Sequence, residues 1–186
     1  MAEPSNIVML AQDIAGSCQN PDYEGGVWLQ GADLTIGRMN SPDRSGKSGN
    51  DGFTSASNVT ITKVEDRSDF DLQVKAINGD SITHVWIYEL SEPGQDDETA
   101  KKLVDKVIKL TNVLVEQTNI GWYANMTANR TYTLNWAQLQ VEYNFRNEKG
   151  DKAGSKGHFE QDRVASVNVV TESTFVKPVP ASTPNS

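Results

Sequence analysis

The residues that could bind a ligand or support catalysis are few and scattered along the chain. Gly46-Lys47-Ser48 matches the end of a phosphate-binding loop, but Ser41 stands where that motif requires its first glycine. The surrounding residues are Gly, Ser, Asn and Asp, whereas a phosphate-binding loop lies between a strand and a helix. We therefore interpret this segment as an ordinary loop.

Metal ligands are also scarce in the sequence. The chain contains two histidines, His84 and His158, and one cysteine, Cys18, which are too few for a conventional zinc site. The acidic run at residues 96–98 could attract a cation, but such a run is more typical of a solvated surface or the start of a helix. The sequence also lacks the motifs of serine hydrolases, zinc proteases and dinucleotide-binding enzymes. We predict no catalytic residue, no cofactor and no metal, so an enzyme is the least favoured class.

Composition limits the partners of the protein. The 186 residues include 17 Lys and Arg against 25 Asp and Glu, a net charge of −8, which disfavours nucleic acids and anionic membranes. Mean hydropathy is −0.53, and no apolar run approaches the roughly 18 residues that cross a bilayer. The N-terminal residues lack the basic and apolar regions of a secretory signal, and one cysteine allows no internal disulfide. We expect a cytoplasmic protein with one domain over residues 1–176 and a disordered tail over residues 177–186.

Most of the chain carries strand patterns. The strongest, over residues 131–145, predicts one long strand whose apolar face changes along its length, which suits a barrel or a subunit interface. Its candidate core or interface residues are Trp136, Leu139, Val141 and Tyr143, with Val141 expected to point outward. Further strands are predicted over residues 7–14, 27–36, 58–64, 82–90 and 164–170, with turn-forming segments at 18–26, 38–57, 91–97 and 147–157.

Two segments carry helical patterns. Ser68 and Asp71 have the spacing of a capping box, apolar residues then recur at helical spacing, and Gly79 is a typical helix terminator. These features predict a helix over residues 69–78, although the same residues also alternate as in a strand. Residues 98–117 combine an amphipathic helical pattern around 103–109 with a strand pattern over 108–115, and the sequence leaves this boundary open.

The four tryptophans, Trp28, Trp86, Trp122 and Trp136, suggest a second class of function. Exposed together, they could form a platform for a sugar, and the chain would then be a monomeric β-sandwich that binds carbohydrate or protein. Three of the four lie in strand patterns, which favours packing in a core or an interface.

Several segments together resemble the haemolysin co-regulated protein (Hcp) family, the tail-tube proteins of type VI secretion. Residues 131–143 resemble the final strand of that family, and residues 108–115 are similar to the strand before its last hairpin. Residues 59–66, followed by the expected helix and Gly79, resemble its strand, its turn and its single helix. Residues 7–16 and 26–29 resemble its opening strands.

This resemblance implies a mainly β protein, a barrel of antiparallel strands with one short α-helix, that assembles into hexameric rings. The rings would stack into a tube inside a contractile sheath, capped by a spike, and carry effectors toward a target cell. The subunit would be stored in the cytoplasm and secreted without a signal peptide.

The resemblance also suggests a role for the long segment over residues 38–57. In the family, the corresponding extended loop reaches the adjacent ring. Here it carries Arg38, Arg44, Lys47 and Phe53, and its cations contrast with the acidic net charge of the protein. We therefore expect these residues to contribute to ring stacking, partly through charge complementarity.

Overall fold

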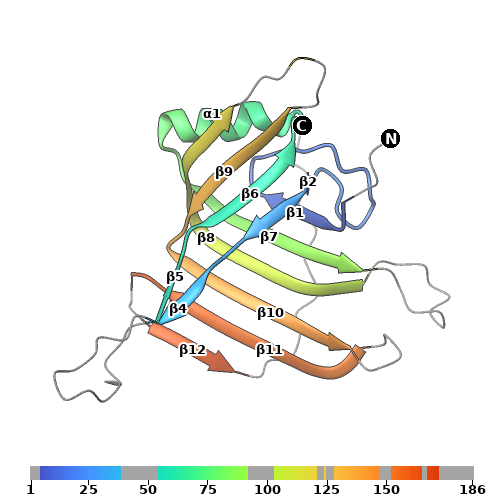
Figure 1. Cartoon of the computed structure of the whole chain (residues 1–186), viewed down its shortest axis with the longest axis vertical. Helices are drawn as coiled ribbons and strands as arrows, with labels where there is room; N and C mark the ends of the chain where they lie inside the picture. Colours follow the sequence, from blue (N-terminus) through green and yellow to red (C-terminus); the bar gives the residue numbers. More distant parts are fainter. Residues whose placement is uncertain are drawn as a thin grey trace.

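The computed structural model describes residues 5–38, 54–91, 103–120, 124, 128–146, 152–164 and 167–171. Within these residues the chain is almost entirely β, with a single helix (Figure 1). The elements are β1 (Ile7–Ala11), β2 (Val27–Leu29), β3 (Gly31–Asp33), β4 (Ile36–Arg38), β5 (Thr54–Ala56), β6 (Val59–Val64), α1 (Ser68–Asn78), β7 (Ile82–Ser91), β8 (Leu103–Ile120), β9 (Asn129–Asn135), β10 (Gln138–Arg146), β11 (Lys152–Asp162) and β12 (Val167–Thr171).

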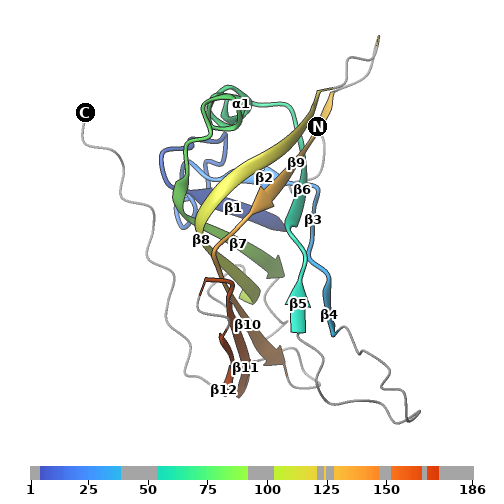
Figure 2. The same ribbon diagram turned by 90° about the vertical axis from the view of Figure 1, so that its left-hand side faces the viewer.

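Ten strands form one antiparallel sheet, in the order β12-β11-β10-β8-β7-β1-β2. A branch leaves this path at β8, which also pairs with β9, and continues through β6 to β3. Figure 2 shows β3, β6 and the β4–β5 pair on one side of the molecule and β7, β10, β11 and β12 on the other. The sheet does not close: β2 and β3 are separated at Gln30, whose N–H donates to the carbonyl of Thr62 at 2.7 Å. The predicted barrel is therefore an open sheet folded into two layers.

The chain passes from one layer to the other at a bend, which lies between β9 and β10 and at the neighbouring residues of β8. Residues 131–145, predicted as one strand, form β9 and β10 with an interruption at Trp136 and Ala137. The Ala137 N–H donates to the carbonyl of Thr111, and the next residue of β8, Asn112, has a φ of 51°. Asparagine tolerates this left-handed backbone better than most residues. The change of buried face read from the sequence therefore marks a corner.

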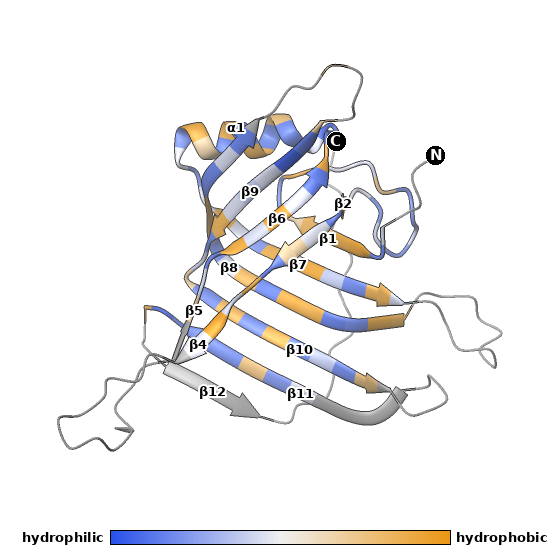
Figure 3. Cartoon of the chain, in the orientation of Figure 1, coloured by the Kyte–Doolittle hydropathy of each residue, from blue (hydrophilic) through white to orange (hydrophobic). Residues whose placement is uncertain are grey.

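The main core fills the space between the layers. It consists of aliphatic and aromatic residues from both sides, among them Met9, Leu29, Ile61, Leu110, Leu134 and Leu139. Figure 3 shows the matching alternation of apolar and polar residues along β7, β8 and β10. A second, smaller cluster lies on the opposite face of β1 and β7, where the loop after β1 covers it; it contains Val8, Leu10, Cys18, Tyr23, Tyr88 and Leu90. Both faces of β1 and β7 are thus covered within one chain.

Helix α1 begins one residue earlier than predicted and packs against β8. The predicted capping box of Ser68 and Asp71 is wrong, because the reciprocal bonds belong to Asp66 and Asp69. Asp66 Oδ1 accepts from the Ser68 N–H at 2.9 Å, and the Asp66 N–H donates to Asp69 Oδ2 at 2.6 Å. Gly79 ends the helix as expected, with a φ of 71° and its N–H donating to the carbonyl of Lys75 at 3.0 Å. Leu72 is buried, whereas Phe70 and Ile77 are exposed.

Other boundaries differ from the predictions in detail. The single strand predicted over residues 27–36 is divided into β2, β3 and the first residue of β4. The strand predicted over residues 7–14 ends at Ala11, with one further bridge from Ala11 to Ile14. The helical alternative around 103–109 is wrong, since this segment is part of β8. The predicted turn over 147–157 is wrong from Lys152 onward, where β11 begins, and the last strand starts at Val167. The tail at 177–186 lies outside the described residues.

Candidate functional site

The strongest electrostatic feature is a buried ion cluster at the start of α1. Lys63 of β6 is fully buried, and its Nζ lies 2.9 Å from Asp66 Oδ1 and 2.7 Å from Asp69 Oδ2. Tyr132 of β9 donates to Asp69 Oδ1 at 2.5 Å. Because the cluster joins β6, α1 and β9 and its buried ammonium is paired with two carboxylates, it locks the helix onto the sheet.

Burial and hydrogen bonding set the protonation of these groups. Burial alone would raise the pKa of Asp66, but hydrogen bonds from Ser68 and Lys63 outweigh it and hold the pKa of Asp66 below its usual value. The pKa of Tyr132 is raised, first by burial and then by its hydrogen bond to Asp69. At neutral pH Asp66 is therefore ionised and Tyr132 is a neutral donor, so the cluster is suited to stability more than to proton transfer.

The second cluster supports a loop and a shallow cavity. Tyr23 packs against Tyr88 with their ring centroids 5.3 Å apart, and burial raises the pKa of Tyr23 to about 12. Burial also raises the pKa of the Cys18 thiol, which makes this cysteine less reactive than an exposed one. The loop closes tightly because a Cβ on Gly16 would lie 2.1 Å from the carbonyl oxygen of Gly26.

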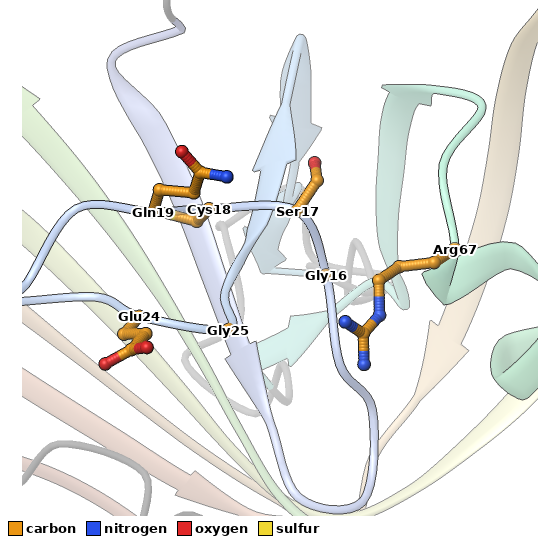
Figure 4. A pocket seen from close by; sticks show the side chains of 7 residues that line it. All are labelled: Gly16, Ser17, Cys18, Gln19, Glu24, Gly25 and Arg67. Atoms are coloured by element: carbon orange, nitrogen blue, oxygen red, sulfur yellow. The ribbon is translucent and has the colours of Figure 1, made fainter.

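A cavity of about 560 Å³ lies beside this loop; it is lined by Gly16, Ser17, Cys18, Gln19, Glu24, Gly25 and Arg67. Figure 4 shows the Arg67 side chain reaching from the start of α1 toward the Gly16 side of the loop. The Glu24 carboxylate points away from it on the far side. Ligand sites usually have several polar groups converging on an enclosed apolar space, and this cavity does not have that arrangement.

The two histidines lie on the face of the sheet opposite the main core. His158 of β11 is opposite Glu142 of β10, with 3.8 Å between His158 Nδ1 and Glu142 Oε1. His158 Nε2 lies 3.9 Å from Glu160 Oε2, and both separations exceed hydrogen-bonding distance. His84 packs against Trp86, with 5.3 Å between ring centroids. Across the residues that the structure describes, no three His, Cys, Asp or Glu side chains are placed to hold a metal ion.

The candidate residues of the long predicted strand divide between core and surface. Trp136, Leu139 and Val141 are buried, with exposed fractions of 2%, 0% and 1%. The expectation that Val141 points outward is therefore wrong, because the corner at Trp136 turns this face of β10 toward the core. Further along the same face Tyr143 is 38% exposed and Phe145 50% exposed, so the core side of β10 runs out into solvent.

Residues of the predicted stacking loop are only partly described. Arg38 ends β4, which pairs with β5 in a separate two-stranded ribbon. Arg44, Lys47 and Phe53 lie outside the described residues. Sequence reasoning did not single out Arg163, which follows β11 and contacts the base of this ribbon; an isolated arginine between strand patterns carries no motif that would have identified it.

The tryptophans in the described part of the chain are packed against other residues. Trp28 and Trp86 pack against the second cluster, and Trp136 belongs to the main core. Trp122 lies outside the described residues. The described tryptophans therefore do not form a common exposed platform for a sugar.

Comparison with known proteins identifies the family. The model of the family described as "Type VI secretion system effector, Hcp" matches residues 8–143, which is most of the chain. The chain belongs to the Hcp family. The resemblance read from the sequence is confirmed, and the family is one of structural secreted proteins, not known for enzymatic activity.

Solved structures of Hcp-type proteins share the fold. A type six secretion system protein matches with a TM-score of 0.77 at 17% identity, over 88% of this chain and 98% of that chain. Hcp1 from Salmonella typhimurium matches with a TM-score of 0.67 at 16% identity, over 88% and 97%. A type VI secretion system effector from Yersinia pestis gives 0.61 at 11% identity, over 84% and 98%. No curated protein matches the chain.

In the part of the chain covered by the structure, no helix is long and apolar enough to span a membrane.

Proposed function

We propose that this chain is the tube subunit of a type VI secretion apparatus. Six copies form a ring, rings stack into a tube within a contractile sheath beneath a spike, and the tube carries effectors. The rings are stored in the cytoplasm and leave through the apparatus itself. Family membership supports this proposal. The structural observation that supports it is the apolar face of β10, which continues beyond the core into exposed aromatic residues.

On that face the buried residues continue into exposed aromatic ones. Leu139 and Val141 belong to the core, and Tyr143 and Phe145 follow at two-residue spacing on the same side of the strand. Phe145 lies over Gly157 of β11, where an added Cβ would be 3.3 Å from the Phe145 ring. Aromatic residues that extend a core past its own covering layer are well suited to packing against a neighbouring subunit.

The ends of the sheet support the same interpretation. In the described residues β12 pairs only with β11, and β2 pairs only with β1, so each strand leaves one side of its backbone without a ladder partner. Natural proteins cover or pair such edges, because free strand edges promote uncontrolled association. A ring in which one subunit covers the edge and the apolar face of the next would satisfy both requirements.

The experiment is a measurement of native mass on three proteins. The parent should give a ring of six times the chain mass of 20.4 kDa at micromolar concentration. Phe145→Asp should give folded monomers, because it places a charge in the interface, whereas Phe70→Asp should leave rings intact, since Phe70 is exposed on α1, away from the proposed interface.

A parent protein that stays at the mass of one chain would refute the proposal and favour a monomeric binding module. Rings that persist in Phe145→Asp would remove the β10 face from the interface. The cations of the 38–57 segment add a second readout: stacking of rings into tubes should weaken as salt rises above physiological strength, where the screening length is about 8 Å.

A further inference from the structure

The β4–β5 ribbon is too small to hold its own position. It contains three residue pairs, from Ile36 with Ala56 to Arg38 with Thr54, and it forms no backbone ladder with the ten-stranded sheet. Isolated two-stranded ribbons are marginally stable in water even when they are longer. Contacts other than strand pairing must therefore fix its direction.

Side chains from the end of β11 supply these contacts. The N–H of Ala56 donates to Gln161 Oε1 at 3.2 Å, and Arg163 Nη2 donates to the Ala56 carbonyl at 2.7 Å. Both backbone groups of Ala56 that face the main sheet are thus bonded by side chains, as a neighbouring strand would bond them. The adjacent Ser57 carbonyl accepts a hydrogen bond from Trp136 Nε1 at 3.0 Å.

Arg163 is itself held rigidly. Its guanidinium carbon lies 3.7 Å from the centroid of the Trp136 ring, a stacked cation–π arrangement. Its Nη1 donates to Asn135 Oδ1 at 2.7 Å and to Asn58 Oδ1 at 3.1 Å. The backbone N–H of Arg163 donates to the Ala137 carbonyl at 2.9 Å. A planar guanidinium with five donors can stack on the indole and make all of the side-chain hydrogen bonds at once, whereas a lysine ammonium cannot.

We propose that Arg163 is a positioning residue that sets the direction in which the β4–β5 ribbon leaves the domain. The guanidinium connects three parts of the chain: the corner between β9 and β10, the end of β11, and the base of the ribbon. This inference rests on the proposed function, because the ribbon carries both ends of the segment proposed to join one ring to the next. By fixing this direction, Arg163 allows rings to stack into tubes, although it does not itself contact the adjacent ring.

The test compares Arg163→Met, Arg163→Lys and a matched control, Arg67→Met, which removes an exposed arginine at the start of α1. Hydrogen exchange measured by mass spectrometry reports the ribbon directly. In Arg163→Met the amides of residues 54–57 should exchange at least about tenfold faster, because two hydrogen bonds to a charged group are lost from the ribbon and its neighbour. Peptides from β7 and β8 should be unchanged, Arg163→Lys should be intermediate, and Arg67→Met should match the parent.

Sedimentation of the same proteins connects the ribbon to assembly. Arg163→Met should form rings but few tubes, with partial recovery in Arg163→Lys. Unchanged exchange at residues 54–57 would overturn the positioning role, and so would a uniform rise in exchange across β7 and β8, which would show only a loss of global stability. Faster exchange confined to the ribbon with normal tubes would support the positioning role and refute the part of the proposed function that assigns stacking to this segment.

Discussion

Replacing Lys63 by methionine tests whether the buried ion cluster anchors α1. Methionine preserves most of the side-chain volume but removes the charge that lies within 2.9 Å of Asp66 and 2.7 Å of Asp69. Two carboxylates then remain beside each other, with Asp69 only 5% exposed. Removing one partner of a buried ion pair typically costs about 3–5 kcal/mol, so we expect the free energy of unfolding at pH 7 to fall by that amount.

The loss should depend on pH with a definite sign. Because the pKa of Asp66 is held below its usual value in the folded parent, its carboxylate stabilises the fold above its unfolded pKa, near 4, and this contribution is lost as pH falls through the folded pKa. In Lys63→Met the part of that contribution that Lys63 supplies is absent, whereas the hydrogen bonds from Ser68 remain. The difference between parent and variant should therefore be largest above about pH 5 and shrink below about pH 4.

A matched control is the pair of Lys106 and Glu89, whose Nζ–Oε2 distance is 2.6 Å. Their side chains are 35% and 42% exposed, so Lys106→Met should cost no more than about 1 kcal/mol. Urea denaturation followed by tryptophan fluorescence measures both variants. Adding Asp69→Asn to Lys63→Met should recover part of the stability, because it removes one unpaired charge. Equal losses in the two lysine variants, or a loss in Lys63→Met that is the same at pH 3 and pH 7, would refute the reasoning.

Two further predictions follow from burial and close approach. Burial raises the pKa of Tyr23 to about 12 and also raises the pKa of Tyr88 and Tyr132. In an absorbance titration these tyrosines should therefore ionise at higher pH in the folded protein than in urea, and the stability of the fold should fall as pH rises above 10. Ionisation at the same pH in both states would contradict the packing. Gly16→Ala should destabilise the protein by well over 1 kcal/mol in urea denaturation, because its Cβ would meet the Gly26 carbonyl, whereas Gly31→Ala has nothing within 4 Å and should cost far less; similar losses would contradict the closure of the loop.

Most strands were predictable because their alternation reports burial on one face. The segment around 103–109 was not, since Val104 and Val107 are spaced as on a helix yet lie in β8. A register shift between Glu89 and Leu90, opposite this part of β8, explains the spacing. One extra residue in a strand returns two residues three apart to the same face, and both valines pack against the second cluster. Local pattern cannot distinguish such a bulge from a helical turn.

The candidate site was predictable only where it depended on family resemblance. The aromatic end of β10 was visible as an apolar alternation, but the corner that turns Val141 toward the core depends on how the two layers are joined. The ion cluster and the Arg163 contacts unite residues up to 107 positions apart in sequence, as in the bond from Arg163 to the Ala56 carbonyl. The Arg163 contacts involve no local motif, so no short-range pattern predicts them. Lys63, Asp66 and Asp69 are close in sequence, but their contact with Tyr132 spans 63 positions.

The corner at Trp136 connects these separate observations. The apolar face of β9 includes Tyr132 and Leu134, and after the interruption the buried residues of β10 are Leu139 and Val141, one position out of phase. The chain can therefore pass into the second layer and still bury the apolar face of β9 and the apolar face of β10 against the same core. The indole at this corner lies beneath the Arg163 guanidinium and donates to the Ser57 carbonyl, so the change of layer also fixes the base of the ribbon. A phase change in an alternating pattern, when it coincides with a large aromatic residue, is thus better explained by a corner that organises its surroundings than by one continuous strand.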